Sequence, residues 1–239
     1  MTEIREIHHE NGTITFEQDF NYTSKQKGLI LSSFFYGYIT TQIIGGYLAS
    51  QFGGNIIFGI GIGVTGLLTL FTPLAAKTSI YALVTIRIIE GIFEGMTYPC
   101  CYHIWSRWSP QLERSRMANF AMAGSYVGAV VALPLCGIFA SAFGWESVFY
   151  IFGVVAMVWF FLWIFIVKAS PEKDPRISQE EKDYIMTNRS SIEDGPPKFS
   201  EIPWKSIFTS MPVWAIIVAH FCESWGFFTM FTELPSFLK

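Results

Sequence analysis

Charged side chains are scarce in this sequence and absent from long parts of it. Only 15% of the 239 residues are Asp, Glu, Lys or Arg, whereas soluble domains usually carry about 25%. Residues 28–76, 117–145 and 147–167 contain none. A bilayer core of about 30 Å needs roughly 20 apolar residues per helix, so the first of these runs is long enough for two spans. The sequence therefore predicts an all-α polytopic membrane protein and argues against a water-soluble globule.

The sequence also lacks a basic excess and any cysteine motif. Its formal net charge is −3, so no basic stripe is present to neutralise phosphates, and we expect no nucleic-acid partner. The four cysteines lie in or beside apolar runs without CxxC or Cys/His ligand spacing. They are interpreted as small core residues, and no metal or cofactor is expected. No apolar stretch precedes residue 28, so no cleavable signal peptide is expected.

Hydropathy and helix breakers predict six membrane spans. They cover residues 28–50, 55–74, 79–104, 117–141, 147–168 and 211–236. Glycine turns join the first span to the second, at Gly53-Gly54-Asn55, and the fourth to the fifth, at Gly144. The chain then has four parts: a leading segment over 1–27, five helices over 28–168, a polar loop over 169–210, and a last helix within 211–239.

Basic residues crowd the loop after the third span and the loop over 169–210, so both are predicted to be cytosolic by the positive-inside rule. Residues 1–27 then lie on the lumenal or extracellular side. Two sequons in that segment make Asn11 and Asn21 candidate glycosylation sites. The long loop contains Ser178-Gln179-Glu180-Glu181, a capping box that predicts a short amphipathic helix through Met186.

Three ionisable residues stand in the middle of the third span: Arg87, Glu90 and Glu94. Each costs at least about 2.5 to 3.5 kcal/mol at the centre of a membrane helix. At about 100° per residue, all three project from one face within roughly 60°. One interpretation is an ion-pair network that fixes helix packing, with Glu94 paired to another helix. The other is a site in which Arg87 binds an anion and a carboxylate takes up or releases H+.

Other polar residues at membrane depth suit the same two interpretations. A stripe on the first span is too polar to face lipid and predicts either a cavity wall or interhelical hydrogen bonds; it consists of Tyr38, Thr41, Gln42 and Gly45. Gly91 and Gly95 form a small-xxx-small pair that favours close helix packing. Glu223 adds another acid in the last span, facing either the cavity or a neighbouring helix.

Four motifs stand in order along the chain and carry a resemblance. They are Ser33-Phe34-Phe35-Tyr36-Gly37-Tyr38 with Thr41-Gln42-Ile43, Arg87-Ile88-Ile89-Glu90-Gly91 with Glu94-Gly95, Trp105-Ser106 followed by Leu112-Glu113-Arg114-Ser115-Arg116, and Trp225-Gly226-Phe227 with Leu234-Pro235. From about residue 18 the chain resembles the anion transporters of the major facilitator superfamily, which include sialin, the vesicular glutamate transporters and the sodium-phosphate cotransporter-like proteins.

The resemblance implies a two-lobe, twelve-helix transporter with alternating access around a midplane site. The six spans then correspond to the second to sixth helices of the N-terminal lobe and the first helix of the C-terminal lobe. Residues 169–210 become the inter-lobe loop. The chain is therefore expected to be a fragment that lacks the first helix and most of the C-terminal lobe.

Matching residue by residue, the resemblance gives Arg87 the role of the substrate arginine and Glu94 that of the proton-coupling glutamate. Glu90 matches sialin-like members, whereas the glutamate transporters have glutamine there. Those transporters also carry histidine in place of Leu31 and arginine in place of Glu223. These differences imply a sialin-like or phosphate-cotransporter-like carrier of a small organic or inorganic anion.

The expected site therefore contains two sets of residues. Arg87, Tyr38 and Gln42 are expected to bind the substrate. Glu94, Glu90 and Glu223 are expected to take part in proton coupling. The coupling ion is H+ or Na+, and the membrane is lysosomal, vesicular or plasma membrane.

Two alternatives stand beside the transporter. In the first, the chain does not transport and instead associates with, or regulates, a full-length carrier of the same family. In the second, it is an intramembrane enzyme, but Ser32, Ser33 and His103 have no suitable base beside them, so we expect no enzyme.

Overall fold

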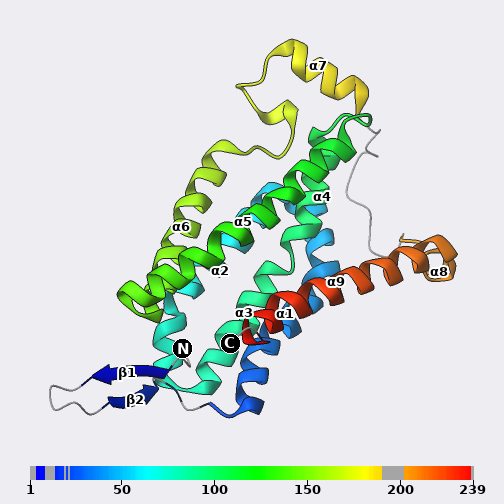
Figure 1. Ribbon diagram of the computed structural model, residues 1–239. Coiled ribbons are helices and arrows are strands. Elements are labelled where there is room, and N and C mark those ends of the chain that lie inside the picture. Colours follow the sequence, from blue (N-terminus) through cyan, green and yellow to red (C-terminus); the bar gives the residue numbers. More distant parts are fainter. Residues whose placement is uncertain (1–3, 9–13, 19, 21, 190–201, 238–239) are drawn as a thin grey trace. The chain divides into compact units, whose positions relative to one another are not determined.

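The computed structural model describes residues 4–8, 14–18, 20, 22–189 and 202–237 (Figure 1). Its elements are β1 (Ile4–His8), β2 (Ile14–Gln18), α1 (Ser24–Phe52), α2 (Gly54–Thr78), α3 (Ile80–Glu94), α4 (Thr97–Trp108), α5 (Arg114–Phe143), α6 (Trp145–Ile166), a 3-10 turn η1 (Pro171–Lys173), α7 (Gln179–Asn188), α8 (Trp204–Thr209) and α9 (Met211–Phe237). The chain forms two compact units, Met1–Asp194 and Gly195–Lys239. The second unit contains α8 and α9.

The predicted spans all fall on helices, and the membrane part of the chain is all-α. Four helices within the described residues are long and apolar enough to cross a membrane: Gly54–Thr78, Arg114–Phe143, Trp145–Ile166 and Met211–Met230. The other two predicted spans do not meet that measure. α1 has 29 residues but carries the polar stripe that includes Tyr38 and Gln42, and the third span is divided into two shorter helices.

The prediction of one continuous helix over 79–104 is wrong. α3 ends at Glu94, Gly95 and Met96 form a turn, and α4 begins at Thr97. Pro99 has no N–H to donate to the Gly95 carbonyl four residues earlier, and its ring crowds that carbonyl. Gly95 itself also has a low helix propensity. The two residues together interrupt the helix directly after Glu94.

The leading segment contains two short strands that the sequence analysis did not predict. β1 and β2 pair antiparallel, with Ile4 opposite Gln18 and His8 opposite Ile14. The hairpin lies outside the predicted spans and leaves the helical character of the membrane part unchanged.

Single glycines join the helices of two pairs, as predicted. Gly53 connects α1 to α2 with a φ of 97°, and Gly144 connects α5 to α6 with a φ of 87°. A side chain is strained in that conformation, so only glycine makes so short a connection at low cost. Each pair therefore forms a tight antiparallel hairpin of helices.

In the first unit, α2 packs against α3, α4 and α6, and α1 packs against α3 (Figure 1). The α2–α6 contact combines glycines on α2 with aromatic rings on α6. A Cβ on Gly63 would lie 2.6 Å from the ring of Phe160, and the rings of Trp159 and Trp163 stack with centroids 4.9 Å apart. The indole N–H of Trp163 donates to the Asn55 carbonyl at 2.8 Å. These contacts fix α2 against α6.

Candidate functional site

The structure brings two members of the predicted charge cluster into direct contact on α3. Arg87 Nη1 donates to Glu90 Oε2 at 2.9 Å. The Glu90 side chain is only 1% exposed, while the Arg87 side chain is 35% exposed. The buried acid thus satisfies one edge of the guanidinium, and the rest of the arginine stays accessible.

The second oxygen of Glu90 contacts two residues that the sequence analysis missed. Thr69 Oγ1 and Thr72 Oγ1, both on α2, lie 3.3 Å and 3.2 Å from Glu90 Oε1. Thr72 is itself 1% exposed. Both oxygens of the Glu90 carboxylate therefore have partners, and α2 and α3 are joined by polar contacts in the interior of the unit.

Glu94 lies one helical turn beyond Glu90 and is half-buried. It interacts electrostatically with Glu90 and with the phenol of Tyr38 on α1. Within the described part of the chain, no cation forms an ion pair with it. The structure thus contains the Arg87–Glu90 pair of the ion-pair interpretation, whereas the expected cross-helix cation for Glu94 is absent from the described residues.

Two residues of the polar stripe of α1 pack against α3 and the turn after it, and the other two lie next to the charge cluster. Thr41 and Gly45 are buried: a Cβ on Gly95 would lie against Thr41, and a Cβ on Gly45 would lie 2.7 Å from Met96 Cα. Tyr38 and Gln42 are half-buried, and they interact with each other and, through Tyr38, with Glu94. Tyr38 and Gln42 thus form the α1 wall next to the charge cluster.

Three glycines bring that wall close to α3. A Cβ on Gly91 would collide with the Phe34 carbonyl, one on Gly37 with the Ile88 carbonyl, and one on Gly95 with the Tyr38 carbonyl. Backbone therefore lies directly against backbone between the two helices. This confirms the packing role predicted for the small-xxx-small pair.

Glu223 belongs to the second unit. It lies on α9, where its carboxylate is 3.6 Å from His220 Nδ1 and 56% of its side chain is exposed. The predicted glycosylation sites Asn11 and Asn21 lie outside the described residues. Among the residues that are described, no group of three His, Cys, Asp or Glu side chains is placed to hold a metal ion, and the four cysteines are free.

The predicted helix of the long loop is α7, and it is tied to the rest of the first unit. Ser178 caps it by accepting from the Glu181 N–H at 3.2 Å. The Tyr184 hydroxyl donates to Glu113 Oε1 at 2.9 Å, and Arg189 Nη2 lies 2.7 Å from Glu172 Oε1. We call this set of contacts the α7 clasp. It fixes the first part of the loop against the α4–α5 turn.

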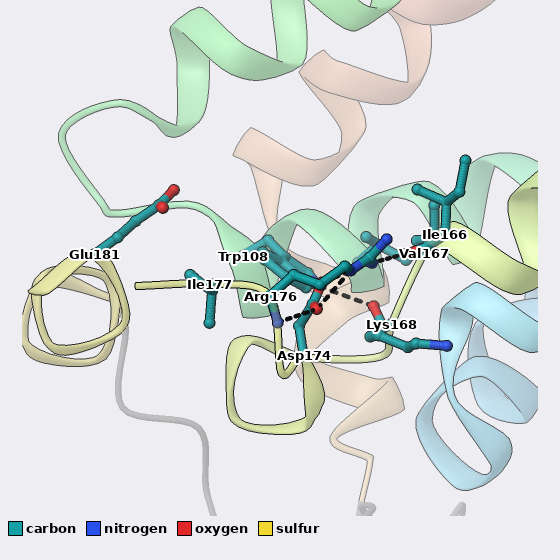
Figure 2. A pocket seen from close by; sticks show the side chains of 9 residues that line it. Trp108, Ile166, Val167, Lys168, Asp174, Arg176, Ile177 and Glu181 are labelled. Carbon is teal, nitrogen blue, oxygen red and sulfur yellow. Dashed lines mark hydrogen bonds and ion pairs between the residues drawn. The ribbon is translucent and has the colours of Figure 1, made fainter. Parts of the chain in front are cut away.

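A cleft of about 500 Å³ lies beside the clasp, where the ends of α4 and α6 meet the loop (Figure 2). Its lining is Ile104, Trp108, Ile166, Val167, Lys168, Asp174, Arg176, Ile177 and Glu181. Most of its polar groups bond to one another. The Trp108 N–H donates to the Lys168 carbonyl at 3.1 Å, and Arg176 pairs with Asp174 at 2.9 Å and donates to the Ile166 carbonyl. These bonds make the cleft a structural junction.

Two acids of this region, Glu172 and Asp174, have pKa values below their ordinary ones. Partial burial raises the pKa of Glu172, but hydrogen bonds from Ser170, its own backbone and Arg189 outweigh burial and leave that pKa below its ordinary value of 4.5. The hydrogen bond from the Arg176 side chain likewise lowers the pKa of Asp174 from 3.8. A lowered pKa adds stability above the ordinary value, which is lost as the pH falls through the lowered one.

We therefore expect the α7 clasp to persist from neutral pH down to about pH 4.5 and to loosen only in stronger acid. The persistence of the clasp is measured as the protection of residues 179–188 from amide hydrogen exchange, corrected for the intrinsic exchange rate at each pH. Glu172→Gln should weaken protection at neutral pH and remove part of the acid-dependent step. Loss of protection in the wild type between pH 7 and 5 would contradict the expectation.

Comparison with known proteins agrees with this architecture. The family model for the Major Facilitator Superfamily matches residues 11–239. The chain belongs to the Major Facilitator Superfamily. Its relatives include sialin from Ovis aries, 44% identical over 236 residues, vesicular glutamate transporter 3 from Danio rerio, 44% identical over 233 residues, and sialin from Homo sapiens, 45% identical over 220 residues.

These alignments cover 99%, 96% and 92% of this superfamily chain. They cover 46%, 39% and 44% of the three relatives, so the chain spans a little under half of their length. The resemblance found from the four motifs is confirmed: the chain is a multi-pass membrane protein of a transporter family and not of an enzyme family. Identity to sialin and to the glutamate transporter is nearly equal, so it does not separate those branches.

Proposed function

We propose that the full-length protein containing these residues is a secondary active transporter that moves a small organic or inorganic anion together with H+ or Na+. The observation that carries this proposal is the asymmetry of the Arg87–Glu90 pair. The acid is buried and the arginine is 35% exposed, so the guanidinium keeps donors free for a second anion. A planar guanidinium is well suited to bind carboxylate or phosphate through two hydrogen bonds.

The surrounding residues take complementary roles. Tyr38 and Gln42 line the path to Arg87 from α1. Glu94 carries the coupling proton, which is supported by its half-buried position and by the lack of a paired cation among the described residues. Glu90 modulates the arginine by competing with the substrate for it. Glu223 contributes from the C-terminal lobe.

The arrangement in the membrane is proposed from the charge pattern. Residues 1–27 face the lumen or the exterior, with Asn11 and Asn21 available for glycosylation, and residues 169–210 are the cytosolic inter-lobe loop. Glu90, Leu31 and Glu223 favour a sialin-like or phosphate-cotransporter-like carrier. One relative is named a vesicular transporter, and we propose a vesicular, lysosomal or plasma membrane location. Association of a shorter product with a full-length carrier stays a prediction.

Uptake into proteoliposomes tests the transport assignment. The full-length protein is reconstituted with an inward proton or sodium gradient and assayed with labelled glucuronate, glutamate and inorganic phosphate. Arg87→Ala should abolish uptake because no other cation is available on α3 for the anion. Glu94→Gln should preserve the exchange of anions across the membrane. It should make net uptake independent of the proton gradient.

Two results would contradict the assignment. One is uptake by Arg87→Ala equal to that of the wild type, and the other is unchanged proton dependence in Glu94→Gln. Lys77→Ala serves as the control, because Lys77 is a cation at the end of α2 whose side chain is 56% exposed and pairs with Glu146. This variant should transport normally.

A further inference from the structure

The two threonines on α2 have a hydrogen-bonding arrangement that goes beyond packing. Thr69 Oγ1 lies 2.8 Å from the Thr65 carbonyl and 3.3 Å from Glu90 Oε1. Thr72 Oγ1 lies 3.1 Å from the Leu68 carbonyl and 3.2 Å from the same carboxylate oxygen. Each hydroxyl therefore has two acceptors within reach but only one hydrogen to donate.

A hydroxyl between these acceptors can serve both protonation states of the acid. When Glu90 is ionised, the hydroxyl hydrogens turn to Oε1. When Oε1 carries a proton, each hydroxyl donates back to its own helix, and one of them accepts the proton of the acid. A backbone N–H could donate to the carboxyl group in either state, but it could not accept a hydrogen bond from the proton of the neutral acid.

Burial makes this adaptability important. Glu90 is 1% exposed, so water cannot compensate for a bond lost on protonation, and an unsatisfied buried polar group is costly. The groups that face Glu90 are few: Arg87 and Glu94 lie on its own helix. α2 carries Lys77 as its only charged residue, and Lys77 is bonded to Glu146 at 2.7 Å. α1 contributes Tyr38, which acts on Glu94.

We infer that Thr69 and Thr72 are positioning residues that let Glu90 gain and lose a proton without moving, and so set the pH at which Arg87 is released to bind an anion. The inference rests on the proposed function and names a regulation of the same site. The proton comes from the aqueous phase. Its arrival removes the charge that holds Arg87, and its departure restores the ion pair.

The decisive experiment follows the protonation of Glu90 directly. The carboxylic acid C=O stretch of the full-length protein is recorded by infrared spectroscopy as a function of pH, and Glu90→Gln identifies the band. Valine preserves the shape of threonine but removes both hydrogen-bonding functions, and the ionised acid loses more than the neutral one because bonds to charged groups are stronger. The Thr69→Val, Thr72→Val double variant should therefore shift the midpoint of the band upward by about one pH unit or more.

Serine variants separate this role from helix packing. Thr69→Ser, Thr72→Ser keeps both hydroxyls and should retain the wild-type midpoint. Thr78→Val is the control on the same helix, because the Thr78 hydroxyl bonds to the Leu74 carbonyl of its own helix at 2.8 Å; this variant should also keep the midpoint. If the double valine variant does not fold, Thr69→Val and Thr72→Val are titrated singly, each with a smaller shift in the same direction.

An unchanged midpoint in folded valine variants, or an equal shift in the serine variants, would overturn the inference. Because the infrared titration needs no substrate, it is independent of the transport assay. Loss of uptake in Arg87→Ala with an unchanged midpoint in the valine variants would refute the role of the threonines alone. Normal uptake in Arg87→Ala would refute the proposed function, and with it the link from Glu90 protonation to anion binding, even if the valine variants shift the midpoint as expected.

Discussion

Glu90→Leu is expected to destabilise the protein by about 1 to 3 kcal/mol, the usual cost of leaving a polar group without its partner, because the Arg87 side chain left behind is 35% exposed. Leucine leaves Arg87 charged at membrane depth, and a guanidinium cannot neutralise itself by losing its proton. Arg87→Met is expected to cost more, about 3 to 5 kcal/mol, because it leaves the Glu90 carboxylate, which is 1% exposed, without its cation.

The double variant Arg87→Met, Glu90→Leu should be far more stable than either single variant. It removes both charges together and fills the space with apolar side chains of similar size. Thermal unfolding of the four proteins in one detergent gives the coupling free energy between the two residues. Additive destabilisation would mean that the two charges do not support each other.

An exposed ion pair provides the matched control for this cycle. Lys77 and Glu146 lie 2.7 Å apart, with side chains 56% and 33% exposed. Pairs of this kind contribute about 0 to 1 kcal/mol. The same cycle at Lys77 and Glu146 should therefore give a small coupling free energy, and the difference between the two cycles isolates the effect of burial.

Gly37→Ala is expected to have the second large effect, a destabilisation at or above the upper end of the about 1 to 3 kcal/mol typical of overpacking. A Cβ at this position would collide with the Ile88 carbonyl and lie 2.8 Å from the Ile92 nitrogen. Both are backbone atoms of α3, so a side-chain rotation cannot relieve the contact. α1 and α3 must separate, which also moves Tyr38 away from Glu94.

Gly28 supplies the control on the same helix. A methyl group added there would meet no heavy atom within 4 Å among the described residues, apart from the adjoining backbone of α1 itself. Gly28→Ala should therefore be neutral or stabilise by up to about 1 kcal/mol through helix propensity. Size-exclusion chromatography after a temperature ramp compares the two variants. Equal melting temperatures would show that α1 and α3 are not in backbone contact.

The features that depend on local spacing could be predicted from the sequence. Arg87 and Glu90 meet because residues three apart share a helix face, and Gly91 and Gly95 pack because small residues allow close approach. Gly53 and Gly144 marked the short connections. Each of these outcomes follows from one helix or one turn.

The features that depend on neighbouring helices could not be predicted in the same way. Thr69 and Thr72 look like ordinary membrane threonines that bond to their own helix, and only the packing of α2 on α3 reveals Glu90 as a second partner. The break after Glu94 was missed for another reason. Pro73 and Pro134 lie within continuous helices, so proline alone is a weak signal; Pro99 differs in having glycine four residues before it.

The same break separates the motion of α4 from that of α3 within the third span. The Gly95 carbonyl receives no bond from Pro99, and in hydrocarbon such peptide groups are tolerated only where protein or water surrounds them. Gly95 and Met96 are buried, with α1 packed against both. A tilt of α4 can thus be taken up at Gly95 and Met96. The Arg87 guanidinium on α3 is then expected to keep its orientation while the Trp108 end of α4 moves.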